Sequence, residues 1–172
     1  MTTLCRNVTF FEYAPIVDLP CMDHYCVTAP STSKWPFPYG TKLEETGYYT
    51  KDLKVASEPK PIWVWSQGLF DWDERPNQTV PTPEELAVQL VQNIGYGAKG
   101  ILWFTFRKNP GMQYPETRNA IREWGRVLRL TREDILGSDP ILHENIVSPA
   151  NVDAMALVNN NKLILCVTNK DY

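Results

Sequence analysis

The sequence predicts an α/β fold that forms part of a (β/α)8 barrel and then the start of a β-sandwich. Two apolar runs, residues 61–67 and 100–107, are each followed by a polar loop and a helical pattern. The helix-to-strand connections are short, whereas the loops that leave the strands are long, and in barrels such loops carry the active site. A hairpin pattern then occupies the tail. We therefore expect a partial barrel over 1–137, a linker over 138–150 and the beginning of a β-domain over 151–172.

The first strand–helix unit has the clearest helix start in the chain. After the strand at 61–67 and the polar loop at 68–81, Thr82 suits the N-cap and Pro83 the first helical position. Glu85 completes a capping box with Thr82. An apolar stripe follows, and the helix is expected to end at two glycines. The stripe and these glycines are Leu86, Leu90, Val91, Ile94, Gly95 and Gly97.

The second unit repeats this order, and a weaker unit precedes both. The run at 100–107 is almost continuously apolar, as expected for a parallel strand covered on both faces. A loop at 108–114 and a helix near 115–130 follow. Upstream, Asn7 could cap a short helix through Phe10, Phe11 and Tyr13. A strand is then expected at 18–25 and a helix near 42–56.

The tail changes from helical to strand patterns. Thr131 is expected to cap a last short helix, which Gly137-Ser-Asp-Pro140 ends. The runs at 153–158 and 162–168 flank Asn159-Asn-Asn161, which is typical of a β-hairpin. Because a lone hairpin is marginal in water, we expect it to begin a β-sandwich.

Composition excludes several classes of function. A net charge of -3 gives no electrostatic basis for nucleic-acid binding. A membrane span is not expected, because no apolar run approaches ~18–20 residues. No signal peptide is visible at Met1; a longer parent protein is expected to be secreted or periplasmic, and the localisation stays open. The six Trp and eight Tyr suit either a large core or a surface that stacks on sugar rings.

The four cysteines predict neither a disulfide framework nor a metal site. Cys21 and Cys26 flank His24, but side chains alternate between faces along a strand, so Cys21 should point away from the other two. Buried thiols are the better interpretation. No metal and no cofactor are expected.

Three segments resemble glycoside hydrolase barrels of the bacterial β-galactosidase-like and related uncharacterised families. They are Lys60-Pro-Ile-Trp-Val-Trp-Ser-Gln67, Pro81-Thr-Pro-Glu-Glu-Leu86 and Gly97-Ala-Lys-Gly-Ile-Leu-Trp-Phe104. In such barrels they look like the seventh strand, the seventh helix and the eighth strand. Asp23-His-Tyr25 resembles the Asp-x-Tyr that closes the sixth strand, and 154–169 looks like the first strands of the accessory β-domain. The resemblance implies the C-terminal half of a barrel, about strands six to eight. A full barrel needs ~250 residues.

The resemblance also exposes two departures from the family pattern. Retaining members place a Glu nucleophile at the end of strand seven, where this chain has Gln67, or Ser66 if the alignment shifts by one. The strand that carries the acid/base Glu, strand four, is absent. A complete pair of catalytic carboxylates therefore cannot be assembled on the expected pattern. The catalytic residues stay unknown, with Asp23 as a candidate carboxylate.

Five residues are predicted to bind carbohydrate, each with a structural alternative. The candidates are Asp23, Tyr25, Gln67, Trp103 and Arg107. Asp23 and Tyr25 share a strand face and could bind sugar hydroxyls, or cap and pack the barrel. Gln67 could bind a hydroxyl or simply hydrogen-bond loop backbone. Trp103 could be a stacking platform or fill the core, and Arg107 could clamp a carboxylate or hold a loop Asp. If their strands are neighbours, Asp23, Gln67 and Arg107 should converge on one mouth.

The remaining polar and aromatic positions have structural interpretations. Trp63 and Trp65 share a face with Gln67 and are expected to be core or helix-facing. Asp71, Asp73 and Glu74 lie in the loop after this strand. One of them could act as a base in an inverting mechanism, but a solvated acidic loop is the favoured interpretation.

The sequence thus predicts a fragment of a glycoside hydrolase that acts on O-glycosidic bonds and contributes a sugar-binding wall. The isolated chain is not expected to be active. One alternative is a non-catalytic carbohydrate-binding barrel that has lost its nucleophile. Another is an inactive gene fragment. Besides the carbohydrate, the expected partners are the missing N-terminal half of the barrel or a second copy, because unpaired strand edges favour self-association.

Overall fold

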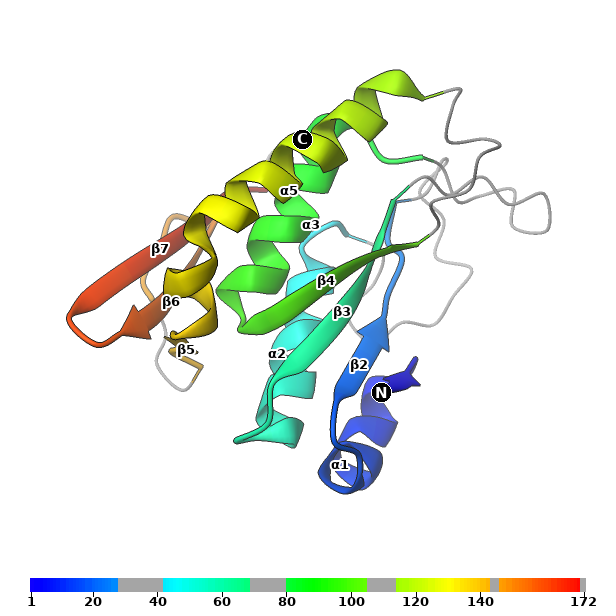
Figure 1. Cartoon of the computed structure of the whole chain (residues 1–172), viewed down its shortest axis with the longest axis vertical. Coiled ribbons are helices and arrows are strands. Elements are labelled where there is room, and N and C mark those ends of the chain that lie inside the picture. Colours follow the sequence, from blue (N-terminus) through cyan, green and yellow to red (C-terminus); the bar gives the residue numbers. More distant parts are fainter. Residues whose placement is uncertain (28–41, 69–79, 105–113, 143–145, 171–172) are drawn as a thin grey trace.

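The structure is a computed structural model that describes residues 1–27, 42–68, 80–104, 114–142 and 146–170. It contains a parallel sheet in the order β1-β2-β3-β4 and a small antiparallel sheet in the order β5-β6-β7 (Figure 1). The parallel strands are β1 Thr2–Leu4, β2 Pro20–Asp23, β3 Ile62–Gln67 and β4 Ala98–Phe104. The predicted α/β class with parallel strands is confirmed.

Helical segments connect and cover these strands. They are η1 Asn7–Thr9, α1 Phe10–Tyr13, η2 Ala14–Ile16, α2 Glu45–Ser57, α3 Pro83–Gly95 and α5 Pro115–Leu136. Each consecutive pair of parallel strands is joined through one of these helical connections, so strand order in the sheet equals strand order in the sequence. Among the described residues, parallel strands and helical segments therefore alternate from β1 to α5.

The described helices that contact the parallel sheet pack on one of its faces, which we call the helix face. Phe10 of α1 and Tyr49 and Leu53 of α2 share a buried cluster with strand side chains. Leu90 and Ile94 of α3 form a second cluster, against which α5 packs. The strand side chains of the helix face are Leu4, Met22, Ile62, Val64, Ser66, Ala98, Ile101 and Trp103.

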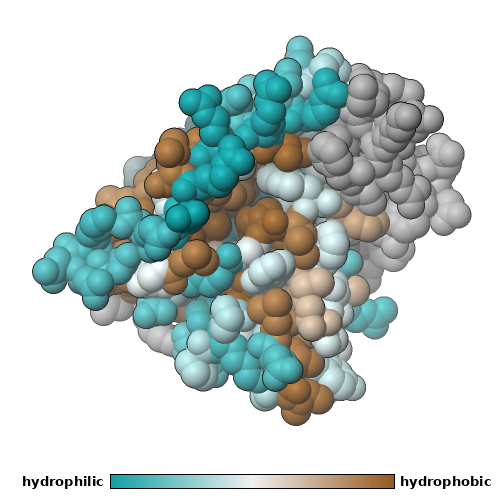
Figure 2. Space-filling view, in the orientation of Figure 1, coloured by the Kyte–Doolittle hydropathy of each residue, from teal (hydrophilic) through white to brown (hydrophobic). Residues whose placement is uncertain are grey.

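The opposite surface of the sheet, which we call the open face, carries the alternate residues. Strand register brings its side chains side by side across β2, β3 and β4, since Asp23 pairs with Trp65 and Trp65 with Leu102. Its members are Cys21, Asp23, Trp63, Trp65, Gln67, Leu102 and Phe104. Figure 1 shows the sheet in front of α2, and Figure 2 shows hydrophobic and pale residues gathered over it.

Helix α3 confirms the predicted start and the predicted apolar stripe. Thr82 Oγ1 accepts from the Glu85 backbone N–H at 3.2 Å, and the Glu85 carboxylate accepts from the Thr82 N–H at 2.8 Å. This is the capping box. Helix α2, expected near 42–56, extends from Glu45 to Ser57.

Two expected caps are wrong. The helix from Pro115 continues without a break to Leu136, whereas a new short helix was expected at Thr131. Thr131 Oγ1 instead donates to the Val127 carbonyl at 3.0 Å, the bond to the preceding turn that a threonine inside a helix can make. Near the N-terminus, Asn7 is the first residue of η1 rather than its cap, and the capping position shows no side-chain hydrogen bond.

The predicted hairpin is confirmed as β6 Val152–Asn159 and β7 Lys162–Asn169, with β5 Asp139–Pro140 beside β6. Asn160 has a φ of 50°, the left-handed conformation that hairpin turns favour. Of the expected β-sandwich, the described residues contain this small sheet, which packs on α3. Leu157 is buried there with Leu90 and Ile94.

Polar contacts also fasten this sheet to the helices. Asp153 forms an ion pair with Lys170 at 3.0 Å and accepts hydrogen bonds from Gln92 of α3 at 3.1 Å and Tyr48 of α2 at 3.4 Å. Lys99 at the start of β4 donates to the carbonyl of Ile135 at 2.7 Å. The C-terminal sheet and the end of α5 are thus tied to the parallel sheet through α2, α3 and β4.

In the described part of the chain, every helix is too short or too polar to cross a membrane.

Two glycines in exposed and buried helical positions give a matched test of this packing. A Cβ on Gly95 would lie 2.8 Å from the Met155 Cβ and 3.0 Å from the Cys166 Cβ, whereas a Cβ on Gly125 would meet nothing within 4 Å. We expect Gly95→Ala to lower the free energy of unfolding by about 1–3 kcal/mol through overpacking. Gly125→Ala should raise it by about 0.5–1 kcal/mol. Urea denaturation measures both; equal effects would contradict the packing of the hairpin on α3.

Candidate functional site

The site predicted from the sequence lies where the parallel strands end. Asp23 is the last residue of β2 and Gln67 the last of β3, and these strands are parallel neighbours, as predicted. The next strand, β4, ends at Phe104. Arg107 lies outside the described residues, so its expected place at the same mouth stays a prediction.

Three aromatic side chains share the open face with Asp23. The ring of Tyr25 stacks on that of Phe104, with centroids 5.2 Å apart and an interplanar angle of 18°. Trp65 meets Phe104 edge to face at 6.2 Å, and Trp65 pairs in register with Asp23. The structure therefore places the Asp23 carboxylate on the same face as three aromatic rings, two from β3 and β4 and one from Tyr25, two residues past β2.

Gln67 is buried and its amide is occupied by backbone. Its Oε1 accepts from the Val27 N–H and its Nε2 donates to the Val27 carbonyl, both at 2.9 Å. Its own N–H donates to Gln89 Oε1 of α3 at 3.0 Å. Of the two roles that the sequence left open for Gln67, the structure shows the hydrogen bonding to loop backbone. A role in binding sugar stays a prediction.

Trp103 is not brought together with Asp23. Its register partner is Ser66, on the helix face, and its side chain packs against the buried cluster of Leu90, Ile94 and Leu157. This placement corresponds to the core-filling alternative. Trp103 alternates with Leu102 and Phe104 along β4, and those two residues point to the open face.

Of the two structural interpretations of Trp63 and Trp65, core or helix-facing, the structure contradicts the helix-facing one, and the core interpretation stays a prediction. Both are half-buried on the open face, and Trp63 lies against Gly100, where a Cβ would come within 2.5 Å of the indole ring. Phe104 was missed by sequence reasoning as well. The alternation of Trp63, Trp65 and Gln67 carried the signal, but only the strand register shows which face the described helices cover.

His24 and Cys21 point to opposite faces, as predicted. His24 is buried and stacks on Tyr49 of α2 with centroids 4.1 Å apart, and burial lowers its pKa to about 4. Burial also raises the pKa of the Cys21 thiol to about 11 and that of Cys26 to about 12, so both are neutral at physiological pH. The described residues contain no cluster of three or more potential metal ligands.

A buried acidic pair at the start of α2 was missed by sequence reasoning. Glu44 and Glu45 are both buried, and Glu45 Oε2 has no hydrogen-bond partner among the described residues. Burial first, and the negative charge of Glu44 second, raise the pKa of Glu45 from 4.5 to about 7. A carboxyl group of this kind can exchange a proton near neutral pH. Neighbouring acidic residues at the start of a helix are typical of exposed charges that favour the helix N-terminus. The sequence therefore gave no sign that this pair is buried.

Glu45 gives the folded protein a defined dependence on pH. Because its folded pKa exceeds its unfolded value, the folded state binds more protons between about 4.5 and 7. Its contribution to stability is therefore complete below the unfolded pKa and is lost as pH rises through about 7. We expect Glu45→Gln to remove this loss, so that thermal unfolding at pH 8 occurs at a higher temperature than in the unsubstituted chain. An identical pH profile in both proteins would contradict the raised pKa.

Gln67 provides a second test, on the anchoring of residue 27. Gln67→Glu would place an oxygen where Nε2 now donates to the Val27 carbonyl, 2.9 Å away. We expect a loss of about 1–3 kcal/mol in the free energy of unfolding, the cost of an unmatched buried polar group. Chemical denaturation at pH 7 measures the loss, and unchanged stability would contradict the two-point contact with Val27.

Comparison with known proteins gives no relative. No protein family model, no curated protein and no solved structure matches this chain. The resemblance to glycoside hydrolase barrels therefore stays a prediction from its motifs.

Proposed function

We propose that this chain is half of a (β/α)8 barrel of a glycoside hydrolase and supplies a wall of its sugar-binding mouth. The observation that carries the proposal is the cluster of Tyr25, Trp65 and Phe104 beside Asp23 on the open face. The cluster lies toward the carboxyl ends of parallel strands, where barrels of this kind bind their substrates.

The topology supports a barrel rather than a doubly wound sheet. In doubly wound folds the strand order reverses and helices cover both faces. Here the order is β1-β2-β3-β4, and the clusters that join α1, α2 and α3 to the sheet use only the helix face. When further strands close an open sheet of this kind into a barrel, the face without helices becomes the interior of the barrel.

The chemistry of the cluster suits a carbohydrate. The apolar C–H face of a pyranose can stack on an aromatic ring, and a carboxylate accepts hydrogen bonds from sugar hydroxyls. Tyr25 and Phe104 provide rings, and Asp23 is the acidic side chain among the described open-face residues of the strands. One described carboxylate is sufficient for binding but not for the two-carboxylate mechanism of most glycosidases.

The non-catalytic alternative has one specific observation in its favour. Gln67, at the position where the resemblance predicts a nucleophile, is buried and bonded to both backbone groups of Val27. A side-chain amide that makes both of these hydrogen bonds fixes the position of the backbone at Val27. A barrel with this residue would bind sugar without forming a glycosyl-enzyme intermediate. The other alternative, an inactive fragment, predicts no saturable sugar binding at all.

The proposal is tested by binding measurements on the full chain with methyl β-D-galactopyranoside and a β-linked galactotetraose. We expect saturable quenching of tryptophan fluorescence, because Trp65 adjoins the cluster. Tyr25→Ala and Asp23→Asn should each weaken binding by about tenfold or more, the loss of one good contact. Trp103→Phe is the matched control, because Trp103 lies on the helix face and should leave the affinity unchanged.

The outcomes separate the hypotheses. Affinity that stays the same in Tyr25→Ala and Asp23→Asn would remove the site, and no saturable binding of either sugar would favour the inactive fragment. Hydrolysis of p-nitrophenyl β-D-galactopyranoside is measured on the same samples. Binding without turnover is expected for the isolated chain, and turnover would show that it carries its own catalytic groups.

A further inference from the structure

Residues 25–27, which we call the anchored segment, follow β2 and are fastened to three different elements. Tyr25 stacks on β4, the Cys26 thiol donates to a carbonyl just before α2 at 3.5 Å, and Val27 bonds to β3 through both backbone groups at 2.9 Å. Their partners are Phe104, Leu43 and Gln67. Because the three residues are consecutive, the position of the Tyr25 ring depends on how firmly its two neighbours are held.

The middle anchor lies at the start of α2, beside the buried acidic pair. Cys26 is buried in an apolar cluster. The backbone N–H of Thr46, in the first turn of α2, also hydrogen-bonds to its sulfur. Burial first, and the charges of Glu45 and Glu44 after it, raise the pKa of the Cys26 thiol to about 12. The side chain that joins the anchored segment to α2 is therefore an electrostatic neighbour of both acids.

The charges around Glu45 do not compensate its own. The titratable and charged groups of the described elements packed around it are Cys26, His24, Lys42, Glu44, Tyr48, Tyr96, Asp153 and Lys170. His24 is neutral near pH 7, because burial lowers its pKa to about 4. Lys42 is exposed, and its ammonium group lowers the pKa of Glu45 less than burial and the Glu44 charge raise it.

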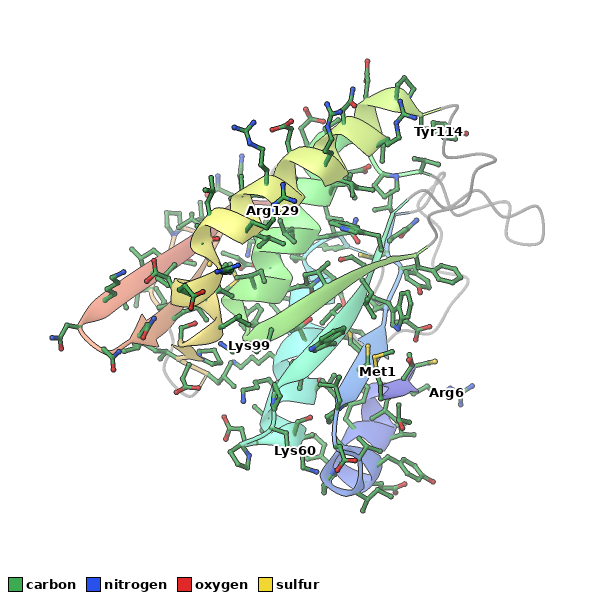
Figure 3. All side chains as sticks on the ribbon, viewed as in Figure 1. Met1, Arg6, Lys60, Lys99, Tyr114 and Arg129 are labelled. Atoms are coloured by element: carbon green, nitrogen blue, oxygen red, sulfur yellow. The ribbon has the colours of Figure 1, made fainter. Side chains whose placement is uncertain are left out.

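Three other lysines of the described structure are engaged elsewhere. Lys170 is paired with Asp153 at 3.0 Å. Lys60 and Lys99, labelled in Figure 3, lie at the starting ends of β3 and β4 and donate to backbone carbonyl groups there. None of the three offsets the charge of the acidic pair, so the buried Glu45 carboxyl group keeps its proton up to about neutral pH.

We propose that Glu45 is a positioning residue of the sugar-binding mouth: its neutral side chain holds the anchored segment against α2 and thereby holds the Tyr25 ring on Phe104. When Glu45 ionises, two negative charges lie buried beside the Cys26 thiol, and burying unpaired charge is costly. Separation of the anchored segment from α2 admits water to these charges and weakens the middle anchor. This role rests on the proposed function, because it concerns the same mouth, and it makes the mouth dependent on pH.

Hydrogen exchange of the full chain, followed by NMR, tests this role without any sugar. The Val27 N–H is bonded to Gln67 Oε1, so its exchange reports release of the anchored segment. With a pKa of about 7 for Glu45 in the anchored state and 4.5 after release, the ratio of released to anchored molecules rises about tenfold from pH 6 to pH 8. We expect the Val27 protection factor to fall by this amount, and Glu45→Gln to abolish the fall.

Two variants and one distant amide serve as controls. Glu44→Gln should reduce the fall, because removal of this charge lowers the pKa of Glu45. Glu84→Gln should leave the fall unchanged, since Glu84 is an exposed acidic residue at the start of α3. The Ile141 N–H, bonded to the Ala156 carbonyl at 2.9 Å in the small sheet, should keep a constant protection factor. Circular dichroism checks that all variants are folded.

The outcomes separate this role from the proposed function. Val27 protection that stays constant with pH, or that falls equally in Glu45→Gln, would overturn the role of Glu45. A fall of the same size at Ile141 would overturn it too, because the whole chain would then loosen. The expected change at Val27 in a chain that binds neither sugar would sink the proposed function alone. Sugar binding with constant Val27 protection would have the opposite consequence.

Discussion

The parallel pairing of β2 with β3 determines what every other side chain in this structure can do. Register places Asp23 beside Trp65, and alternation then assigns each neighbouring residue to the helix face or the open face. Met22 and Val64 thereby reach the core with α2, while Asp23 and Trp65 do not. A slip by one residue would exchange the two sets and bury Asp23 among apolar side chains.

The pairing is reinforced by polar contacts at the carboxyl ends of the strands. Gln67 holds the chain that leaves β2 through both backbone groups of Val27, and Gln89 of α3 holds the backbone of Gln67. Beneath them, Asn93 of α3 donates to Ser66 and accepts from Thr50 of α2. These buried hydrogen bonds depend on direction as well as distance. They therefore fix the positions of the strand ends more precisely than apolar packing would.

Features that depend on residues close together in the sequence could be predicted. Features that depend on which strands and helices pack against one another could not. The capping box at Thr82, the hairpin at 159–161 and the strand ends at Asp23 and Gln67 all follow from short-range patterns. The face of Trp103 and the burial of Glu45 depend on which strands and helices lie alongside, and no local pattern reports this. The helix cap predicted at Thr131 was wrong because the sequence does not distinguish a capping threonine from a threonine that bonds to the preceding turn of its own helix.

The open-face aromatics have different roles according to how far along the strands they lie. Trp63 pairs with Gly100 and Cys21 near the beginning of the strands, and in a closed barrel such a position is packed interior. Phe104 pairs with Gln67 in the last described pair of β3 and β4, and Tyr25, two residues past the end of β2, stacks on it. In the proposed barrel, the same aromatic face would therefore form core near the beginning of the strands and a sugar platform near their carboxyl ends. In that case the stability of the fold and its affinity for sugar depend on different residues, so substitutions can separate the two.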